Sequence, residues 1–428
     1  MAERPPILLI CATFPPCKGI GGRRWAKYAK ALAARGHTVH VVHAACGPDQ
    51  LGSLWTSDVE HPRIVRHALP PRYPAVLAKR PLRTLGEKLA YRFWRAVLPR
   101  LVKGNWLDRA VRWRGTLVPA CARLIEQHGI RHVIASGAPF HLLAHALTLK
   151  ERFPGLRLTA DLRDPWTWGD TYGIQRLPAD RLAHERALER RVVLGADLVI
   201  APGEAMTSHL RKAYPEAAQR IALVPHPVDP DDLRIDAPLP KDGLFRMLYA
   251  GGLYDTGRFR AQLDRVIAVF KRLRTEDPAC AARCRYDVYV LGDDAAPWNQ
   301  RIAEAGLADL IRFHPPLPSR ALHAEVQRAD VVLLMPPPEK KEFISTKFSE
   351  LFHLRAPLLY IGEHGALAKA ITTGGHGLCI GSDELEPVLL AVLRGERVVR
   401  STATGDSDAN LLAPSCEQLC ALLFPPNP

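Results

Sequence analysis

The feature that most constrains the fold is an alternation of short apolar runs with segments of helical period, which continues along the whole chain. In the first half the apolar runs are ILLICA, TVHVVHA, HVIASG, LRLTAD, DLVIAP and IALVPH. Such runs, rich in β-branched residues and bounded by turn residues, are typical of buried strands, and the helical segments are typical of crossovers between parallel strands. The alternation predicts the α/β class with doubly wound parallel sheets.

A proline-rich stretch interrupts this pattern once. Residues 225–240 contain five prolines, and apolar runs restart at FRMLYAGG and continue with DVYVLG, IRFH, DVVLLM, PLLYIG and GLCIG. Proline-rich stretches with few apolar residues are typical of interdomain linkers, and a chain of 428 residues suits two cores better than one. We predict two Rossmann-like domains, residues 1–236 and 237–405, and a tail, 406–428, that packs back across them.

Composition bears on where the protein works. No apolar run approaches the roughly 18 residues of a membrane span, and prolines bracket the N-terminal ILLICATF, unlike the core of a signal peptide. Nine cysteines, an odd number, favour reduced thiols over a disulfide framework. Cys280 with Cys284 and Cys416 with Cys420 lack further zinc ligands nearby and are interpreted as packing residues. We expect a cytoplasmic protein without a metal site.

The net charge of +14 is concentrated in residues 72–114, which hold twelve Lys or Arg and two acids. From Glu87 to Val102, bases at 88, 92 and 95 and apolar residues at 90, 93, 94, 97 and 101 fall on different helical faces, with an interruption expected near Pro99. A basic amphipathic helix is typical of contact with an anionic membrane surface. The alternative is a packed helical insert with solvated cations. Nucleic acid is not expected, because no nucleic-acid motif accompanies the bases.

Ligands of doubly wound sheets bind beyond the carboxyl ends of the strands, so the loops after the strands are candidate sites. Gly19, Gly21 and Gly22 follow the first apolar run and precede a helix, where glycines let an anionic group approach backbone amides. Gly251 and Gly252 repeat this arrangement in the second domain. The alternative for the first loop is a tight strand-to-helix turn.

Charged residues extend the second of these sites. Arg258 lies near the start of the helix after Gly252, where a guanidinium can hold a diphosphate, although a solvated surface charge is equally consistent. Glu342 and Glu350 flank a predicted helix start at Ser345 or Thr346, and their carboxylates can accept hydrogen bonds from sugar and ribose hydroxyls. Lys347 adds charge for a phosphate. From spacing alone, two solvated surface glutamates are the simpler interpretation.

In this order the loops resemble the family 4 glycosyltransferases of the GT-B fold, over nearly the whole chain. The opening PPILLICATFPPCKGIGGRRWAKYAKALAARGHTVHVV is similar to the start of the family's acceptor domain, and ADLRDPWTW and RALERRVVLGADLVIAP to later parts of it. The second half is similar to the family's donor domain in the segments LYAGGLYDTGR, VYVLGD, RADVVLLMP and FSELFHLRAPLLYIG. The pair Glu342 and Glu350 matches the family's paired-glutamate motif in position and spacing.

The resemblance implies a retaining, metal-independent glycosyltransferase without a cofactor, of the kind used in polysaccharide biosynthesis. A sugar moves from a nucleotide-sugar donor to a glycan or lipid-linked acceptor at the cytoplasmic membrane surface. Glu350 is implied to bind the donor ribose, Glu342 the donor sugar and Arg258 the diphosphate. The other donor-binding residues expected are Gly251, Gly252, Lys347, Gly19, Gly21 and Gly22.

On the acceptor side, the family's donor-contacting histidine is best matched by His141 in SGAPFHLLAHA, although a histidine that opens a helix is more often a cap or surface residue. Asp161, Arg163, Asp164 and Trp166 end a strand and suit an acceptor sugar, although Asp–Arg pairing that shapes the loop is equally consistent.

Two departures from the family keep other functions open. Gly252 stands where many relatives have a second phosphate-binding arginine, and His226-Pro227 replaces the usual Asn-Gly. The alternatives are a nucleotide-sugar epimerase or phosphorylase of the same fold, and a non-catalytic binding protein.

Overall fold

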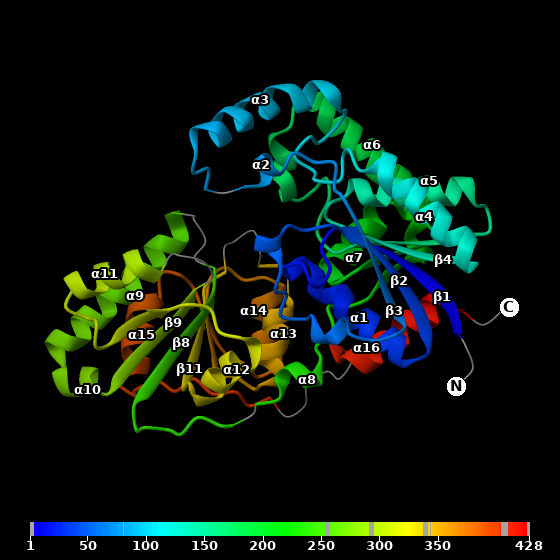
Figure 1. The fold of residues 1–428 in the computed structure, drawn as a ribbon. Helices are drawn as coiled ribbons and strands as arrows, with labels where there is room; N and C mark the ends of the chain where they lie inside the picture. Colours follow the sequence, from blue (N-terminus) through cyan, green and yellow to red (C-terminus); the bar gives the residue numbers. More distant parts are fainter. Residues whose placement is uncertain are drawn as a thin grey trace. The chain divides into compact units, whose positions relative to one another are not determined.

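The computed structural model describes residues 4–79, 81–235, 237–252, 257–290, 295–336, 341–342, 344–403 and 410–425. The chain divides into two compact units (Figure 1): an N-terminal domain of residues 1–227 and 411–428, and a C-terminal domain of residues 228–410. The sequence had suggested boundaries at 236/237 and 405/406. The structure divides the chain at 227/228 and 410/411, so the last residues of the chain belong to the N-terminal domain.

The N-terminal domain is built on a seven-stranded parallel sheet in the order β3-β2-β1-β4-β5-β6-β7. Its strands are β1 (Arg4–Ile10), β2 (His37–Ala44), β3 (Ile64–Leu69), β4 (His132–Gly137), β5 (Arg157–Leu162), β6 (Leu198–Ala201) and β7 (Ile221–Leu223). Every strand predicted in this half is present. β3 was not predicted, because it is an edge strand whose burial alternates and whose sequence, IVRHAL, contains two basic residues.

The helices of this domain are α1 (Arg23–Ala34), α2 (Ala75–Ala78), α3 (Leu85–Leu101), α4 (Arg114–His128), α5 (His141–Arg152), α6 (Ala179–Gly195), α7 (Glu204–Ala213) and α16 (Leu412–Leu423). α16 packs beside α1, and its Leu412, Cys416, Leu419 and Leu423 enter the same core as Ile7 and Trp25. The chain end therefore completes the N-terminal core.

The C-terminal domain holds a six-stranded parallel sheet in the order β10-β9-β8-β11-β12-β13. The strands are β8 (Phe245–Gly251), β9 (Cys284–Val290), β10 (Ile311–His314), β11 (Val331–Leu334), β12 (Leu358–Ile361) and β13 (Gly377–Ile380), as predicted. The helices are α8 (Pro230–Leu233), α9 (Gly257–Glu276), α10 (Pro278–Ala282), α11 (Ala295–Glu304), α12 (Ser319–Arg328), α13 (Thr346–His353), α14 (Ala366–Thr373) and α15 (Leu385–Leu393). Two α/β domains with parallel sheets confirm the predicted fold class.

Strand order locates the crevice of each domain. The order reverses between β1 and β4 in the N-terminal sheet and between β8 and β11 in the C-terminal sheet. Doubly wound sheets bind ligands beyond the carboxyl ends of the strands at such switch points. The loops after β1 and β8, which hold the two glycine clusters, therefore lie where a ligand is expected.

The cysteines correct one expectation. Cys17 and Cys46 form a disulfide, with an S–S distance of 2.15 Å, although the sequence had favoured reduced thiols throughout. The two residues follow β1 and β2, which pair in parallel, so their loops emerge at the same edge of the sheet. Cys280 and Cys284 are buried, and both thiols lie close to the Leu393 carbonyl oxygen, in keeping with a packing role.

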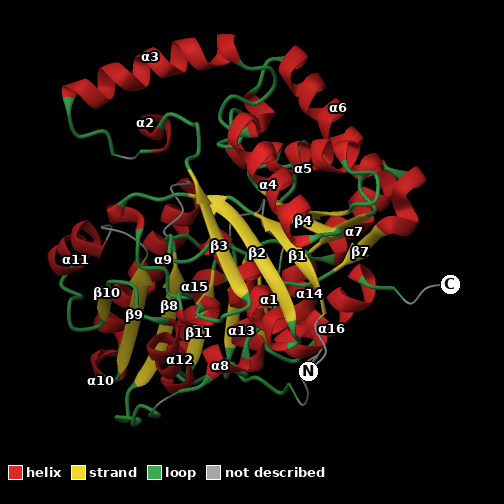
Figure 2. Ribbon diagram, turned by 45° about the vertical axis from the view of Figure 1, so that its right-hand side comes forward, coloured by secondary structure: helices red, strands yellow, loops and turns green. Residues whose placement is uncertain are grey.

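The basic segment forms the predicted helix, but with a different outer face. α3 begins at a capping box between Thr84 and Glu87 and continues through Pro99 to Leu101, so the expected interruption is absent. Leu98 is its buried residue, and in Figures 1 and 2 the helix lies outside the layer of helices that covers the sheet. Within the described residues, no helix combines the length and hydrophobicity of a membrane span.

Candidate functional site

The glycine loop after β1 is held in place by the domain itself. Gly19 has a φ of 130°, which favours glycine. A Cβ on Gly22 would lie 3.2 Å from the Thr13 carbonyl oxygen, and one on Gly21 would lie 2.8 Å from a guanidinium nitrogen of Arg163. Gly22 is buried, whereas Gly19 is exposed and Gly21 half-buried. Only the first two of the three glycines therefore offer backbone to a ligand.

Asp161, predicted on the acceptor side, is a fully buried hub at the end of β5. Its carboxylate lies 3.2 Å from Arg24 Nη2 and accepts hydrogen bonds from Trp25 Nε1 at 2.7 Å and Ser136 Oγ at 2.8 Å. A carboxylate with no exposed surface and these partners cannot contact an acceptor. Asp161 ties α1 to β4 and β5 through Arg24, an arginine outside the loop, and so differs from the pairing within the loop that the sequence left open.

Arg163 joins two loops at the carboxyl edge of the sheet. Its Nη1 donates to the Gly21 carbonyl oxygen, and its Nη2 donates to the Ala138 carbonyl oxygen at 2.6 Å. Its Nε lies 3.4 Å from a carboxylate oxygen of Asp164, whose side chain is 47% exposed. Of the predicted acceptor-side carboxylates, Asp164 is the one that reaches the surface.

Trp166 and His141 are buried in one network around Glu185. The Glu185 carboxylate lies 2.9 Å from His141 Nε2 and accepts hydrogen bonds from Trp166 Nε1 at 2.9 Å and Asn105 N at 2.7 Å. The Trp166 ring stacks on Phe140. Trp166 has no exposed surface and His141 only 6%. Neither side chain is therefore placed to touch a substrate, which corrects both predictions.

The His141 network has a positioning role. Burial lowers the pKa of His141, but the opposing effects of the Asp108 and Glu185 carboxylates are larger together and raise it. The His141 imidazole is thus influenced chiefly by two buried acidic side chains, Asp108 and Glu185. Asp108 Oδ2 also accepts from the backbone N–H of Phe140 at the start of α5. The network fastens residues 104–110, at the end of the basic segment, to α5 and α6.

His226 belongs to the site but was noted in the sequence only as a departure from the family. The Arg24 guanidinium donates to the carbonyl oxygens of Val224 at 2.9 Å and Pro225 at 2.6 Å, so α1 holds the two residues that precede this histidine. Burial, followed by the charges of Arg24 and Arg163, lowers the pKa of His226 well below its usual value. A neutral imidazole among guanidiniums results. The Arg23-Arg24 pair beside the glycine loop was the available signal.

In the C-terminal domain, Lys347 and Gly251 converge at the end of β8. Lys347 Nζ donates to the Ala250 carbonyl oxygen and would lie 3.1 Å from a Cβ on Gly251. It also lies 5.2 Å from the centre of the Tyr249 ring, whose hydroxyl donates to the Gly252 carbonyl oxygen at 2.9 Å. Burial lowers the pKa of Lys347 to about 8. A desolvated ammonium beside open backbone suits a phosphate.

The two predicted glutamates lie on either side of the start of α13. Glu350, on the helix, is largely buried, and its Oε2 lies 3.6 Å from His323 Nε2. His323 Nδ1 is 2.9 Å from the Asp232 carbonyl oxygen, which orients the ring. Glu342 is exposed, and its Oε2 accepts from the backbone N–H of Ala366 at the start of α14, 3.2 Å away. The side chain of Arg258, in α9, lies outside the described residues.

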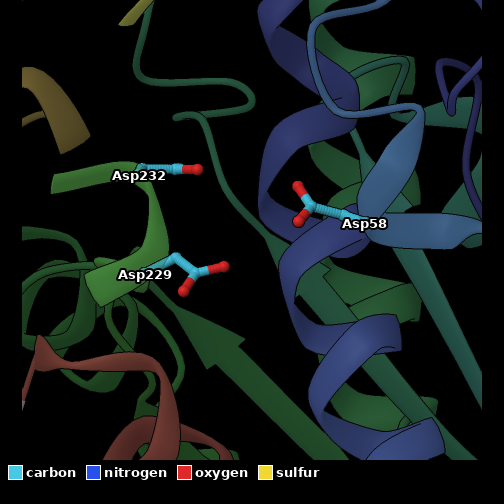
Figure 3. A group of neighbouring side chains, drawn as sticks. All are labelled: Asp58, Asp229 and Asp232. Carbon is cyan, nitrogen blue, oxygen red and sulfur yellow. The ribbon is translucent and has the colours of Figure 1, made fainter. Parts of the chain in front are cut away.

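Three aspartates drawn in Figure 3 are divided between the domains. Asp58 pairs with Lys27 at 2.7 Å and Lys30 at 3.3 Å within the N-terminal domain. Asp229 Oδ1 accepts from the backbone N–H of Asp231 and caps α8, the short helix that also contains Asp232. Contacts within each domain therefore account for the positions of Asp58 and Asp229.

Comparison with known proteins gives one sequence match. Residues 83–232 match the Glycosyltransferase Family 4 model, a segment that runs from the basic helix to the start of the C-terminal domain. No curated protein sequence matches the chain.

Solved structures match nearly the whole chain. A sucrose-phosphate synthase from Thermosynechococcus elongatus has 15% identity and a TM-score of 0.61, over 98% of this chain and 95% of that one. A trehalose-6-phosphate protein from E. coli bound with UDP-2-fluoro glucose has 14% identity and a TM-score of 0.59, over 99% and 100%. A Listeria monocytogenes protein assigned as a UDP-N-acetylglucosamine 2-epimerase has 13% identity and a TM-score of 0.55, over 98% of this chain and 96% of that one. At these identities the likeness shows the fold.

Proposed function

Because residues 83–232 match the Glycosyltransferase Family 4 model and glycosyltransferase structures share the fold of nearly the whole chain, we propose that the protein moves a sugar from a nucleotide-sugar donor to a glycan or lipid-linked acceptor. The observation that carries the proposal is the arrangement after β8, where Lys347 lies against Gly251 and α13 also carries Glu350. A charged group beside open backbone suits a diphosphate, and a carboxylate on the same helix suits sugar hydroxyls. The donor therefore binds the C-terminal domain.

The proposed reaction retains the anomeric configuration and uses no metal. The bond from the anomeric carbon to the diphosphate breaks, the acceptor oxygen bonds to the same face of that carbon, and the acceptor proton leaves with the diphosphate. Lys347 stabilises the negative charge that develops on the departing group. The family resemblance implies that Arg258 also stabilises this charge. Because Gly252 stands where many relatives have a second arginine, Lys347 provides the larger share of the stabilisation.

Product analysis tests this function. The purified protein is incubated with UDP, GDP and ADP sugars, with and without a lipid-linked or oligosaccharide acceptor. UDP sugars come first, since the E. coli neighbour is bound with UDP-2-fluoro glucose. Nucleotide release that depends on the acceptor, with a glycosylated product, supports the proposal. Epimerised sugar formed without any acceptor would instead support the second candidate, an epimerase, which the similarity to the Listeria protein favours.

Donor affinity is expected to fall as the pH rises through about 8. The pKa of Lys347 is lowered from 10.5 to about 8 by burial, so its ammonium is charged below that pH and neutral above it. Only the charged form attracts a diphosphate, so binding is strongest below the pKa and weakens above it. Calorimetric titration of UDP between about pH 6.5 and 9 measures this. Lys347→Met should bind weakly with a flat profile, and a flat profile in the natural protein would exclude this role.

We further propose that α3 places the enzyme on the inner face of an anionic membrane. Leu85, Leu89 and Phe93 recur every four residues along this helix and are 74%, 56% and 57% exposed. Exposed bases at 88, 92 and 95 run beside this apolar stripe. Trp94 and Val97, which the sequence assigned to the outer apolar face, are half-buried. Exposed apolar and basic side chains on one surface suit an interfacial helix.

Sedimentation with vesicles tests α3. The protein should bind phosphatidylglycerol vesicles and not phosphatidylcholine vesicles, since each base near an anionic surface contributes about 1 kcal/mol. The double variant L89S/F93S should reduce the bound fraction several-fold. Leu54→Ser, which removes another exposed apolar side chain of the same domain, should not. Equal binding by the double variant would rule out α3 as the contact.

A further inference from the structure

A pocket of the C-terminal domain lies at the opposite end of its strands from the donor loops. It encloses about 610 Å³ and is lined by Phe245 at the start of β8, Val331 at the start of β11 and Pro357 before β12. The donor loops follow the carboxyl ends of the same strands. No role in glycosyl transfer places a ligand at this amino edge.

The rim of this pocket carries uncompensated positive charge. Lys241, Arg355, Arg397 and Arg400 line it together with one acid, Asp330. Asp330 is already engaged, because its Oδ1 lies 3.3 Å from Lys241 Nζ and its Oδ2 accepts from the backbone N–H of Arg246 at 2.8 Å. The side chains of the three exposed arginines have no hydrogen-bond or ion-pair partner among the described residues.

Arg355 is held in an unfavourable backbone conformation. It follows the last residues of α13 with a φ of 52°, in the left-handed region that glycine usually occupies after a helix. An arginine at such a position has a less favourable backbone conformation than glycine would have, but it places a charged side chain there. Strain of this kind is a reason to look for a ligand.

The floor of the pocket is apolar, and one polar atom in the lining lacks a partner. Val326, Val331, Leu354 and Val399 contribute aliphatic surface. The Ser401 hydroxyl is buried without a hydrogen-bond partner. Buried hydroxyls are normally hydrogen-bonded, so an unpartnered one in a pocket wall calls for a ligand atom. The lining suits a molecule with both an anionic and an apolar part.

We propose that this pocket binds a small organic oxyanion, a phosphate or carboxylate ester with an apolar body, at a site separate from that of the donor. The arginines hold the anionic group by charge-assisted hydrogen bonds, the Ser401 hydroxyl adds one more, and the aliphatic floor covers the apolar part. The proposal does not depend on the function proposed for the donor loops.

A purely structural explanation of the arginines gives a different expectation. α13 and α15 end beside the pocket, at Leu354 and near Gly395, and cations favour the carbonyl groups of helix C-termini. If the arginines only served these helix ends, replacing them would lower the melting temperature and leave no binding to lose.

Titration of the full-length protein with phenyl phosphate tests the site. The natural protein should bind it with a dissociation constant below about 1 mM and bind inorganic phosphate or benzyl alcohol more weakly. The double variant R397Q/R400Q should bind phenyl phosphate at least about tenfold more weakly than the natural protein. Ser401→Ala should lose less affinity than the double variant. Arg312→Gln, which removes an exposed arginine from β10, and Lys347→Met in the donor loops should bind as the natural protein does.

Three results would overturn the proposal. These are no binding by the natural protein up to about 10 mM, an equal loss in Arg312→Gln, or a loss in Lys347→Met with R397Q/R400Q unaffected. The second would mean non-specific attraction to surface charge. The third would assign the probe to the donor loops. A melting curve of each variant separates lost binding from lost folding.

Discussion

Replacing Asp161 by alanine is expected to destabilise the N-terminal domain by about 3–5 kcal/mol, a large fraction of the roughly 5–15 kcal/mol that stabilises an ordinary domain. The change leaves the buried Arg24 guanidinium without its carboxylate and leaves Trp25 Nε1 and Ser136 Oγ without their acceptor. Asp161→Asn keeps the shape of the side chain and removes its charge, so it should lose somewhat less stability than Asp161→Ala. Chemical denaturation followed by tryptophan fluorescence measures the loss of stability in both variants.

Ser136→Ala is the matched control for that experiment. It removes one donor to the same carboxylate and keeps the ion pair, so it should cost only about 1 kcal/mol. If Asp161→Ala cost no more than Ser136→Ala, the Arg24 ion pair would not be the source of stability. The acceptor-binding interpretation of Asp161 predicts a different result again, in which the variant is stable and only transfer is lost.

Replacing Glu350 by alanine is expected to weaken UDP binding about a hundredfold while the protein stays folded. A carboxylate that accepts hydrogen bonds from ribose hydroxyls contributes roughly 1.5–3 kcal/mol for each bond, and a hundredfold loss, about 2.8 kcal/mol, corresponds to two such bonds at the lower end of this range. Glu350 is 16% exposed and lies 3.6 Å from His323, so its carboxylate is oriented but still accessible to a ligand. Isothermal titration calorimetry with UDP gives the affinity directly.

Glu304→Ala removes an exposed glutamate of the same domain and should leave UDP affinity unchanged. Unaltered affinity in Glu350→Ala would remove Glu350 from the donor site. If UDP failed to bind even the natural protein while GDP or ADP bound, the base would change and the role of Glu350 would be tested with that nucleotide.

The sheets were predictable from sequence and much of the site was not, for one physical reason. A parallel strand is buried on both faces, so its apolar run is visible in a few consecutive residues. The edge strand β3 was not predicted because only part of it is buried, so it has no continuous apolar run. The role of a polar residue depends instead on partners far along the chain. Arg24 lies 137 residues from Asp161, and Glu185 lies 44 residues from His141.

Residue type therefore suggested ligand contacts where the structure has internal ones. Asp161, His141 and Trp166 have the chemistry of a binding site, but their partners are also in the protein. The disulfide of Cys17 and Cys46 was missed in the same way, since nothing between the two residues shows that β1 and β2 end side by side. In the C-terminal domain the expected placement of Gly251 and Lys347 depended on neighbouring loops of one sheet edge, and the structure does bring those two together.

The N-terminal domain cannot complete its core until the end of the chain has been synthesised. The N-terminal domain needs α16 to close its core, yet α16 is synthesised only after the whole C-terminal domain, residues 228–410. At about 5–20 residues per second, the first domain waits roughly 10–40 s for its last helix. The backbone N–H of Val228 bonds the Asn410 carbonyl oxygen at 2.8 Å, so the inserted domain begins and ends at one point. It can fold first and deliver α16 to the waiting core.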